Sequence, residues 1–315
     1  MKENLEFIGR SYDPEEKDAL KEVLKEWSKE SSAPVDGELE KTEEEIKIID
    51  TINDFISEEL IHLGIDSYET MPVGKIHILP GDSFKVHFPD FEGQAFFKAT
   101  NDSIYLNKDG LDTKAKLFST LLHELIHRAS TKKFYTDEEK NISDARVGYR
   151  IHSTWKGVER RNRLVGFNEV IVDYTVYKIL SKNQKILEEK IGVTEEDIQG
   201  SIYTYMHYGP ILEAIIVKIA QDKGLDFRNV FEDLERGQFQ NNILVLKDVE
   251  RSFGKGSLKV LSLLQSLEKR EDNNKLENMI KEFFSESDEG RRQELIKEIE
   301  EFVGEIYKNS RPDKD

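Results

Sequence analysis

The 315-residue sequence contains no cysteine and only seven histidines. Without cysteine the chain has no disulfide, no thiolate metal ligand and no cysteine nucleophile. Any transition-metal site must therefore be built from His, Asp or Glu side chains. The few histidines and the carboxylates close to them are the candidate ligands.

Long apolar runs and an excess of positive charge are also missing. No uncharged run approaches the roughly 18 residues of a membrane-spanning helix, and the first residues lack the apolar core of a secretory signal. Charged residues make up 35% of the chain, against about 25% in a typical globular domain, and the net charge is −17. We therefore expect a cytoplasmic protein that binds neither nucleic acid nor a membrane.

Helical patterns dominate both ends of the chain. Asp13 followed by Pro14 is typical of a helix start, and Thr42 with Glu45 forms the capping box of a second helix. Apolar side chains repeat at helical spacing after both starts and again beyond about residue 195. Each terminal region is therefore expected to be mainly helical.

The middle of the chain combines short strands with helices. The runs KIHILP, QAFFKAT and SIYLN are rich in β-branched and aromatic residues and are separated by turn residues. We expect an α+β fold with a helical region over 1–74, a core with a small mixed or antiparallel sheet over 75–210, and a helical C-terminal subdomain over 211–315.

The segment LFSTLLHELIHRAS, residues 117–130, holds two histidines four positions apart in a helical pattern of leucine and isoleucine. On a helix, His123 and His127 lie on one face and can bind one metal ion at about 2.0–2.1 Å. Glu124 is turned about 100° away from His123, so it is a poor third ligand but can act as a general base toward water. The alternative is a helix whose histidines bind no metal.

A catalytic zinc ion takes three protein ligands and leaves one position open. The segment GFNEVIVDY, residues 166–174, places Glu169 and Asp173 one turn apart on a helix, on either side of the apolar VIV. Carboxylates on a buried helix need partners, so one suits a ligand and the other suits the acceptor for a ligating histidine, a task for which Asp173 is placed. A solvated acidic face is the alternative.

HELIH followed by NEVIVD resembles the H-E-x-x-H and N-E-x-x-x-D pattern of the gluzincin metallopeptidases, the thermolysin-like branch of the zincins. The resemblance covers roughly residues 75–210 and implies a zincin-like catalytic domain. It also implies His123, His127 and Glu169 as zinc ligands, Glu124 as the base and Asp173 as the partner of a ligand.

Two features depart from the family pattern. Arg128 stands where an uncharged residue is usual, and the gap between His127 and Glu169 is longer than in thermolysin. The segment RVGYRIHSTWKGVERRNRLVGF within this gap is consistent with an inserted hairpin, and His152 on it is another candidate ligand. A metzincin is disfavoured, because RASTKKF after His127 lacks the glycine and third histidine of that family.

A donor for the transition state is expected from SIYTYMHYGP, residues 201–210, because gluzincins use a Tyr or His for this purpose. Tyr205 and His207 are the first candidates, beside Tyr203 and Tyr208, and aromatic packing at a helix end is the alternative. The histidines without a motif around them are expected to be structural: His62, His77 and His87.

The sequence thus favours a zinc-dependent peptidase with a peptide or protein substrate, which would bind along QAFFKAT or SIYLN as an edge strand. A regulatory or interaction protein that retains a zincin fold with little or no peptidase activity is the alternative. A helical bundle with a purely structural metal is disfavoured by Glu124, because a closed metal site needs no base.

Overall fold

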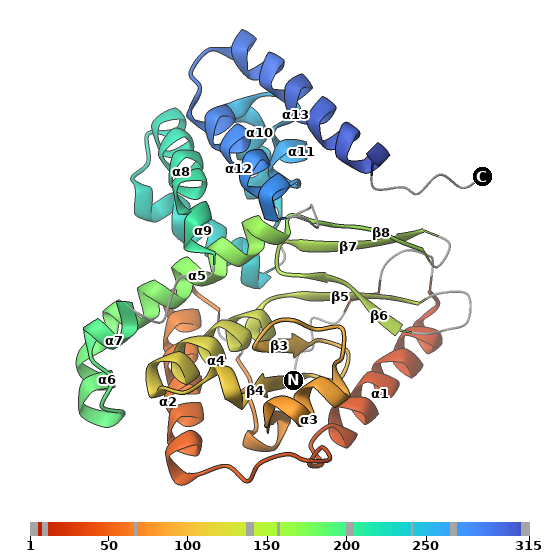
Figure 1. Ribbon diagram of the computed structural model, residues 1–315, viewed down its shortest axis with the longest axis vertical. Helices are drawn as coiled ribbons and strands as arrows, with labels where there is room; N and C mark the ends of the chain where they lie inside the picture. Colours follow the sequence, from red (N-terminus) through yellow and green to blue (C-terminus); the bar gives the residue numbers. More distant parts are fainter. Residues whose placement is uncertain are drawn as a thin grey trace. The chain divides into compact units, whose positions relative to one another are not determined.

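The computed structural model describes residues 6–7, 12–65, 68–136, 142–155, 158–199, 205–240, 242–264 and 270–309. The chain divides into two compact units, Met1–Gly148 with Val172–Thr204 and Tyr149–Ile171 with Tyr205–Asp315. Helices and small groups of strands occur together (Figure 1), so the fold class is α+β as the sequence predicts.

The first unit opens with two capped helices, α1 (Pro14–Glu30) and α2 (Glu43–His62). The Asp13 carboxylate accepts a hydrogen bond from the backbone N–H of Glu16 at 2.7 Å, and both hydrogen bonds of the Thr42–Glu45 capping box are present. These side chains satisfy backbone donors that the first helical turn leaves without a partner. Both predicted helix starts are confirmed.

A three-stranded sheet follows, made of β2 (Ile76–Leu79), β3 (Ala95–Lys98) and β4 (Ser103–Asn107). The strand order is β2-β4-β3, with β2 parallel and β3 antiparallel to β4. Of the two alternatives for the edge strand, QAFFKAT lies at an edge as β3, whereas SIYLN is the central strand β4 and pairs on both sides. A short helix, α3 (Gly81–His87), lies between β2 and β3 and was not expected from the sequence.

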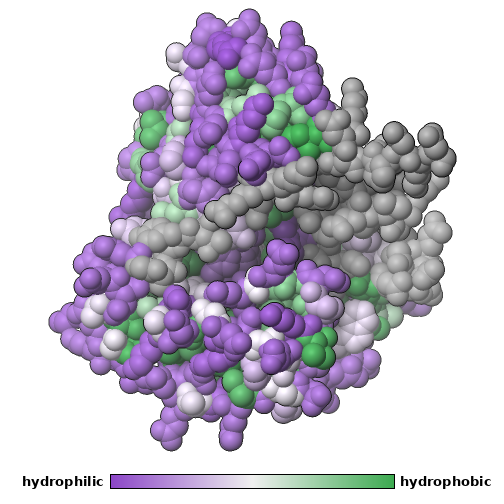
Figure 2. Space-filling view, in the orientation of Figure 1, coloured by the Kyte–Doolittle hydropathy of each residue, from purple (hydrophilic) through white to green (hydrophobic). Residues whose placement is uncertain are grey.

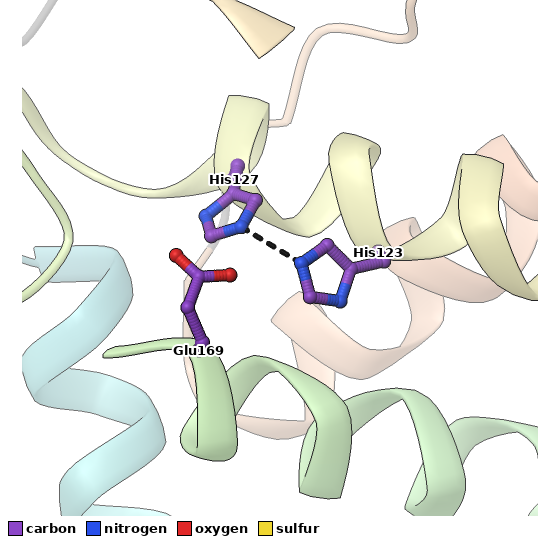
Figure 3. A group of neighbouring side chains, drawn as sticks. All are labelled: His123, His127 and Glu169. Carbon is purple, nitrogen blue, oxygen red and sulfur yellow. Dashed lines mark hydrogen bonds between the residues drawn. The ribbon is translucent and has the colours of Figure 1, made fainter. Parts of the chain in front are cut away.

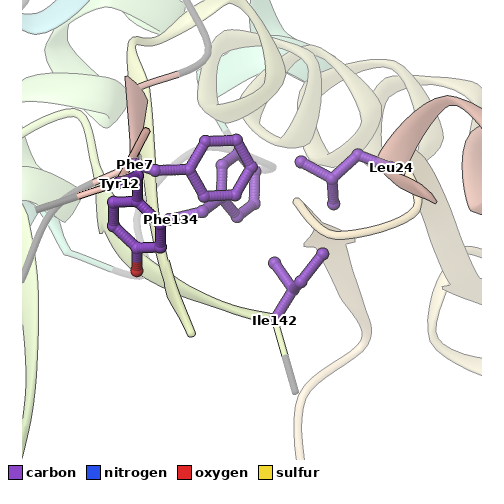
Figure 4. Packing of buried hydrophobic residues seen from close by; sticks show 5 residues of the cluster. All are labelled: Phe7, Tyr12, Leu24, Phe134 and Ile142. Carbon is purple, nitrogen blue, oxygen red and sulfur yellow. The ribbon is translucent and has the colours of Figure 1, made fainter. Parts of the chain in front are cut away.

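A second group of strands joins the start of the chain to its middle. Strand β1 (Glu6–Phe7) pairs in parallel with β5 (Lys132–Thr136), which pairs antiparallel with β6 (Ile142–Val147). Helix α1 packs on these strands through an apolar cluster (Figure 4). Its buried members are Phe7, Tyr12, Leu24, Phe134 and Ile142.

The helices that carry the candidate site are α4 (Lys114–Ala129) and α5 (Val165–Lys182). Helix α4 packs on α2, where the rings of Phe55 and Phe118 lie 6.0 Å apart. Helix α5 is tied to α2 by the ion pair of Lys178 with the buried Glu59 carboxylate, at 2.8 Å. Two short helices, α6 (Gln184–Lys190) and α7 (Glu195–Gln199), complete this part of the first unit.

The second unit combines an antiparallel hairpin with helices. Strands β7 (Arg150–Trp155) and β8 (Val158–Arg163) pair with each other, which confirms the predicted hairpin in the gap after His127. The helices are α8 (Gly209–Lys223), α9 (Phe227–Gln240), α10 (Leu244–Phe253), α11 (Ser257–Leu261), α12 (Arg270–Ser285) and α13 (Glu289–Asn309). Helix α12 packs on α8 and α13, so the predicted helical nature of this region is confirmed.

The described surface is strongly polar. Hydrophilic residues cover most of the described face in Figure 2, in keeping with the 35% of charged residues. Among the described residues, no helix has both the length and the apolar character needed to cross a bilayer.

Candidate metal centre

The two histidines of HELIH face each other on α4. Because they are four residues apart, one helical turn brings their rings together, with centroids 4.7 Å apart. The Nε2 atoms of His123 and His127 lie 3.0 Å apart (Figure 3). In a tetrahedral zinc site with bonds of about 2.0–2.1 Å, two ligating nitrogens lie about 3.3 Å apart, so the pair is close to the spacing that one ion requires.

Helix α5 supplies a carboxylate that orients one of these rings. The Asp173 side chain is buried, and its Oδ1 atom lies 2.8 Å from Nδ1 of His123. A carboxylate accepts, so Nδ1 of His123 carries the hydrogen and the lone pair of the ring lies on Nε2, which faces Nε2 of His127. This is the tautomer that binds a metal through Nε2.

Glu169, one turn before Asp173 on α5, is the third member of this cluster. We call His123, His127 and Glu169 the metal group. One donor atom from each of His123, His127 and Glu169 lies within 4.8 Å of the others, and Figure 3 shows the Glu169 carboxylate beside the ring of His127. Glu169 precedes Asp173 by four residues, so α5 points both carboxylates the same way. Among the described residues, this is the one such group that qualifies as a possible metal site.

The donor set fits a divalent transition metal. Two imidazole nitrogens and one carboxylate oxygen are the ligands of one class of catalytic zinc site, and they leave a coordination position open. Glu169 is 7% exposed, so its carboxylate lies largely out of water, close to the two imidazoles. The residues therefore fit the metal that the sequence predicts.

Glu124 lies on α4 directly after His123 and is 8% exposed. Because successive residues of a helix are turned about 100° from each other, Glu124 does not share the face of His123, and its role as the base stays a prediction. A carboxylate at this place can accept a proton from water near the metal group.

Arg128 forms an ion pair with Asp102. Its Nε and Nη2 atoms donate to the two carboxylate oxygens of Asp102, each at 3.1 Å, and its Nη1 atom donates to the backbone oxygen of Glu69. Lys75 and Lys132 also approach Asp102, at 3.3 and 3.4 Å. Arg128 is therefore buried against a partly buried carboxylate, and this ion pair anchors the end of α4.

The charges around Asp102 set its protonation. Burial alone raises the pKa of this carboxyl, but the charges of Lys132, Arg128 and Lys75 outweigh it and hold the pKa well below its ordinary value. The backbone of Asp102 has a φ of 52°, a left-handed conformation that aspartate tolerates better than most residues.

The candidate donors for the transition state lie in the second unit, before α8. His207 is about half exposed, and its Nε2 atom lies 3.6 Å from Glu277 Oε2 on α12. Tyr205 precedes the 3₁₀ turn η3 (Met206–Tyr208). Burial, with the nearby Glu277 charge, raises the pKa of Tyr208 to about 12, so its hydroxyl stays protonated. Tyr203 lies outside the described residues.

Of the remaining histidines, three were expected to be structural and one, His152, was the other candidate ligand. His77 is fully buried, with Nδ1 2.7 Å from Glu38 Oε2, Nε2 2.8 Å from the Ser31 backbone oxygen and its ring stacked on Tyr105. His87 Nε2 lies 2.9 Å from the backbone oxygen of Asp36. These contacts agree with the structural roles expected for both, while His62 ends α2. His152 lies on β7, and its side chain is outside the described part of the chain.

Sequence reasoning missed Asn168, although it is the N of NEVIVD. Its side chain is fully buried, and its Nδ2 atom lies 3.4 Å from Glu169 Oε1. The signal was present in the quoted pattern, but nothing in the local sequence shows which backbone groups a buried amide will meet.

Comparisons with known proteins give no further guide to this site. No protein-family model, no curated protein and no solved structure matches the chain.

Proposed function

We propose that the protein is a zinc-dependent metallopeptidase with a zincin-like catalytic core. The observation that carries the proposal is the convergence of His123, His127 and Glu169 within 4.8 Å, with His123 oriented by Asp173. The gluzincin resemblance implies the same ligands and the same partner, so two independent lines support one site.

Zinc, when bound, supplies a Lewis acid that polarises a carbonyl oxygen and lowers the pKa of a water molecule to near 7. His123, His127 and Glu169 would hold the ion, and Asp173 would keep His123 in the tautomer that binds through Nε2. Glu124 would accept a proton from the water as the water oxygen attacks the carbonyl carbon of the peptide bond. The same proton would then pass to the leaving amine as the C–N bond breaks.

An extended peptide is the proposed substrate class. Strand β3 packs against α4 and lies at an edge of its sheet, so it leaves one row of backbone groups for an added strand. Tyr205 or His207 would stabilise the oxyanion that forms at the attacked carbonyl. A cytoplasmic location, without nucleic-acid or membrane partners, is proposed from the acidic composition.

The test is peptide hydrolysis by wild type and Glu124→Gln at matched zinc occupancy, with a mixed peptide library as substrate. The substitution keeps the size of the side chain but removes its capacity to accept a proton. We expect zinc binding to remain and the rate to fall about 10²–10⁴-fold, toward the upper end because Glu124 would serve as base and then acid. Glu45→Gln is the matched control, because Glu45 has the same 8% exposure and lies in a helix cap.

Three outcomes contradict the proposal in different ways. Equal cleavage by wild type and Glu124→Gln would indicate a contaminating protease or another mechanism. A wild-type protein that binds zinc and cleaves nothing would favour the regulatory alternative. If Glu169→Ala kept full zinc occupancy and His152→Ala lost it, the third zinc ligand would be His152 and not Glu169.

A further inference from the structure

Asn168 holds the root of the β7–β8 hairpin. Its Oδ1 atom accepts hydrogen bonds from two consecutive backbone N–H groups, that of Tyr149 at 2.8 Å and that of Arg150 at 3.3 Å. Arg150 is the first residue of β7. The backbone at the start of the hairpin is therefore hydrogen-bonded to a side chain of α5.

The other end of the same amide faces the metal group. With Oδ1 taken by two donors, the Nδ2 group of Asn168 is left to donate, and its partner at 3.4 Å is Glu169 Oε1. One planar amide thus contacts both the hairpin and the carboxylate ligand. Asn168 is fully buried, so water does not compete for these bonds.

Tyr149 fixes the hairpin root from the opposite side. It is 1% exposed, its hydroxyl donates to the Leu234 backbone oxygen on α9 at 3.0 Å, and its ring packs on Phe167 at 5.5 Å. Gly237 makes room for it, because a Cβ atom there would lie 1.9 Å from the Tyr149 hydroxyl oxygen. The root is therefore clamped between α5 and α9.

The junction of the hairpin with α5 is also tightly specified. Leu164 follows β8 and precedes α5 with a φ of 58°, an unfavourable conformation for leucine. Its backbone oxygen accepts from the N–H of Asn168 at 2.9 Å, and its side chain is buried. Such strain persists only where the surrounding contacts hold the backbone in place.

We propose that Asn168 is a positioning residue that couples the β7–β8 hairpin to the Glu169 ligand. The inference rests on the metal site of the proposed function. Orientation of Glu169 depends on the amide, and the amide is oriented by the hairpin backbone. Metal binding and the stability of the hairpin root are then linked, and the linkage acts equally in both directions.

The experiment measures zinc affinity and hydrogen exchange on the full chain. Zinc affinity is obtained by competition with a chelator, and exchange is followed at the amides of residues 149 and 150 with and without Zn²⁺. In wild type we expect zinc to slow this exchange. In Asn168→Ala we expect the affinity for zinc to fall about 10-fold, the lower limit of the about 10–100-fold loss that follows removal of a hydrogen-bond partner of a metal ligand. We also expect zinc no longer to slow the exchange of these two amides.

The matched control is Asn53→Ala. Asn53 is also buried, at 4% exposure, and its Oδ1 atom accepts from the Met71 backbone N–H at 2.8 Å and from the Tyr68 hydroxyl at 3.0 Å. Its loss should destabilise the fold in a similar way. A purely structural effect would therefore appear in both variants, whereas loss of coupling should appear only in Asn168→Ala.

Wild-type affinity and a wild-type zinc effect in Asn168→Ala would overturn the inference while leaving the proposed function in place. A wild-type protein that binds no Zn²⁺ would overturn the proposed function and the inference with it. Where Asn168→Ala does not fold, Asn168→Ser is measured instead, because its hydroxyl and one added water can satisfy the buried N–H groups without restoring the contact to Glu169.

Discussion

At the scale of single residues, the centre depends on what each nitrogen of His123 contacts. Nδ1 lies 2.8 Å from Asp173 Oδ1, and Nε2 lies 3.0 Å from Nε2 of His127. The shared face of His123 and His127 could be predicted from sequence, because a spacing of four residues on a helix has one geometric meaning. The sequence suggested Asp173 as the partner of a ligating histidine, but which histidine it contacts depends on how α5 packs on α4.

Asp173→Asn tests the orienting contact. The amide oxygen can still accept from Nδ1 of His123, but the negative charge that makes the imidazole a better ligand is removed. We expect zinc affinity to fall about 10–100-fold with no loss of fold. Competition with a chelator measures the change, and Asp112→Asn is the control, because Asp112 is an exposed carboxylate that contacts Lys116 near the start of α4. Unchanged affinity would make Asp173 an ordinary buried carboxylate.

Tyr205 and His207 test the transition-state donor. Replacement of the true donor should lower kcat by about 10²–10³-fold while zinc content stays at the wild-type level. Tyr205→Phe and His207→Gln are measured first, and Glu277→Gln shows whether the contact of His207 with Glu277 matters. Normal turnover in single variants of Tyr203, Tyr205, His207 and Tyr208 would leave these side chains with a packing role only.

At the scale of elements, the starts of α1 and α2 were the most predictable features. Their capping residues Asp13, Thr42 and Glu45 lie within the first turn and can be recognised from the local sequence. Helix α3 was missed, since its seven residues have too few turns to display a periodic pattern. The anchor of α4 was also missed. Arg128 and Asp102 are 26 residues apart, and no local signal connects a charge near a helix end to a turn between two strands.

Asp102→Asn tests this anchor. Asparagine also tolerates the left-handed backbone at this position, so the substitution removes mainly the charge. Loss of one partner of a buried ion pair costs about 3–5 kcal/mol, and the 21% exposure of the Asp102 side chain favours the lower end. Chemical denaturation at pH 7 should show a decrease of about 3 kcal/mol in the free energy of unfolding.

The pH dependence of the same variant follows from the lowered pKa of Asp102. A carboxyl with a depressed folded-state pKa stabilises the fold fully above its unfolded pKa, about 3.9, and this contribution is lost as the pH falls through the folded-state value. The difference in unfolding free energy between wild type and Asp102→Asn should therefore be constant from pH 7 to about pH 5. It should shrink as the pH is lowered further. A difference independent of pH would show that the charge is not the source.

At the scale of the whole molecule, the helical and strand-like patterns were enough to predict the α+β class, but they did not show which distant segments of the chain pair. Strand β1 pairs Phe7 with Phe134, and α5 runs from one compact unit into the other. Strand pairing over such sequence distances depends on which apolar faces pack together. The local hydrophobic periodicity of a segment therefore does not predict its distant partner. The metal group depends on the same long-range packing, since Glu169 is 42 residues beyond His127.

Zinc should therefore stabilise the native chain as well as activate it. A ligand that binds the folded state alone stabilises it by about 2.7 kcal/mol at 100 times its Kd. In domains of 150–250 residues, each kcal/mol raises Tm by about 2–4 °C. Thermal unfolding of wild type with excess Zn²⁺, compared with chelator, should show a rise of several degrees. His123→Ala and Glu169→Ala should each lose most of this rise, because the unfolded chain and the two-ligand sites bind the ion far more weakly. Glu124→Gln should keep the rise, since its side chain is proposed to move a proton and not to hold the metal. A rise of equal size in all four proteins would place the zinc elsewhere on this acidic chain.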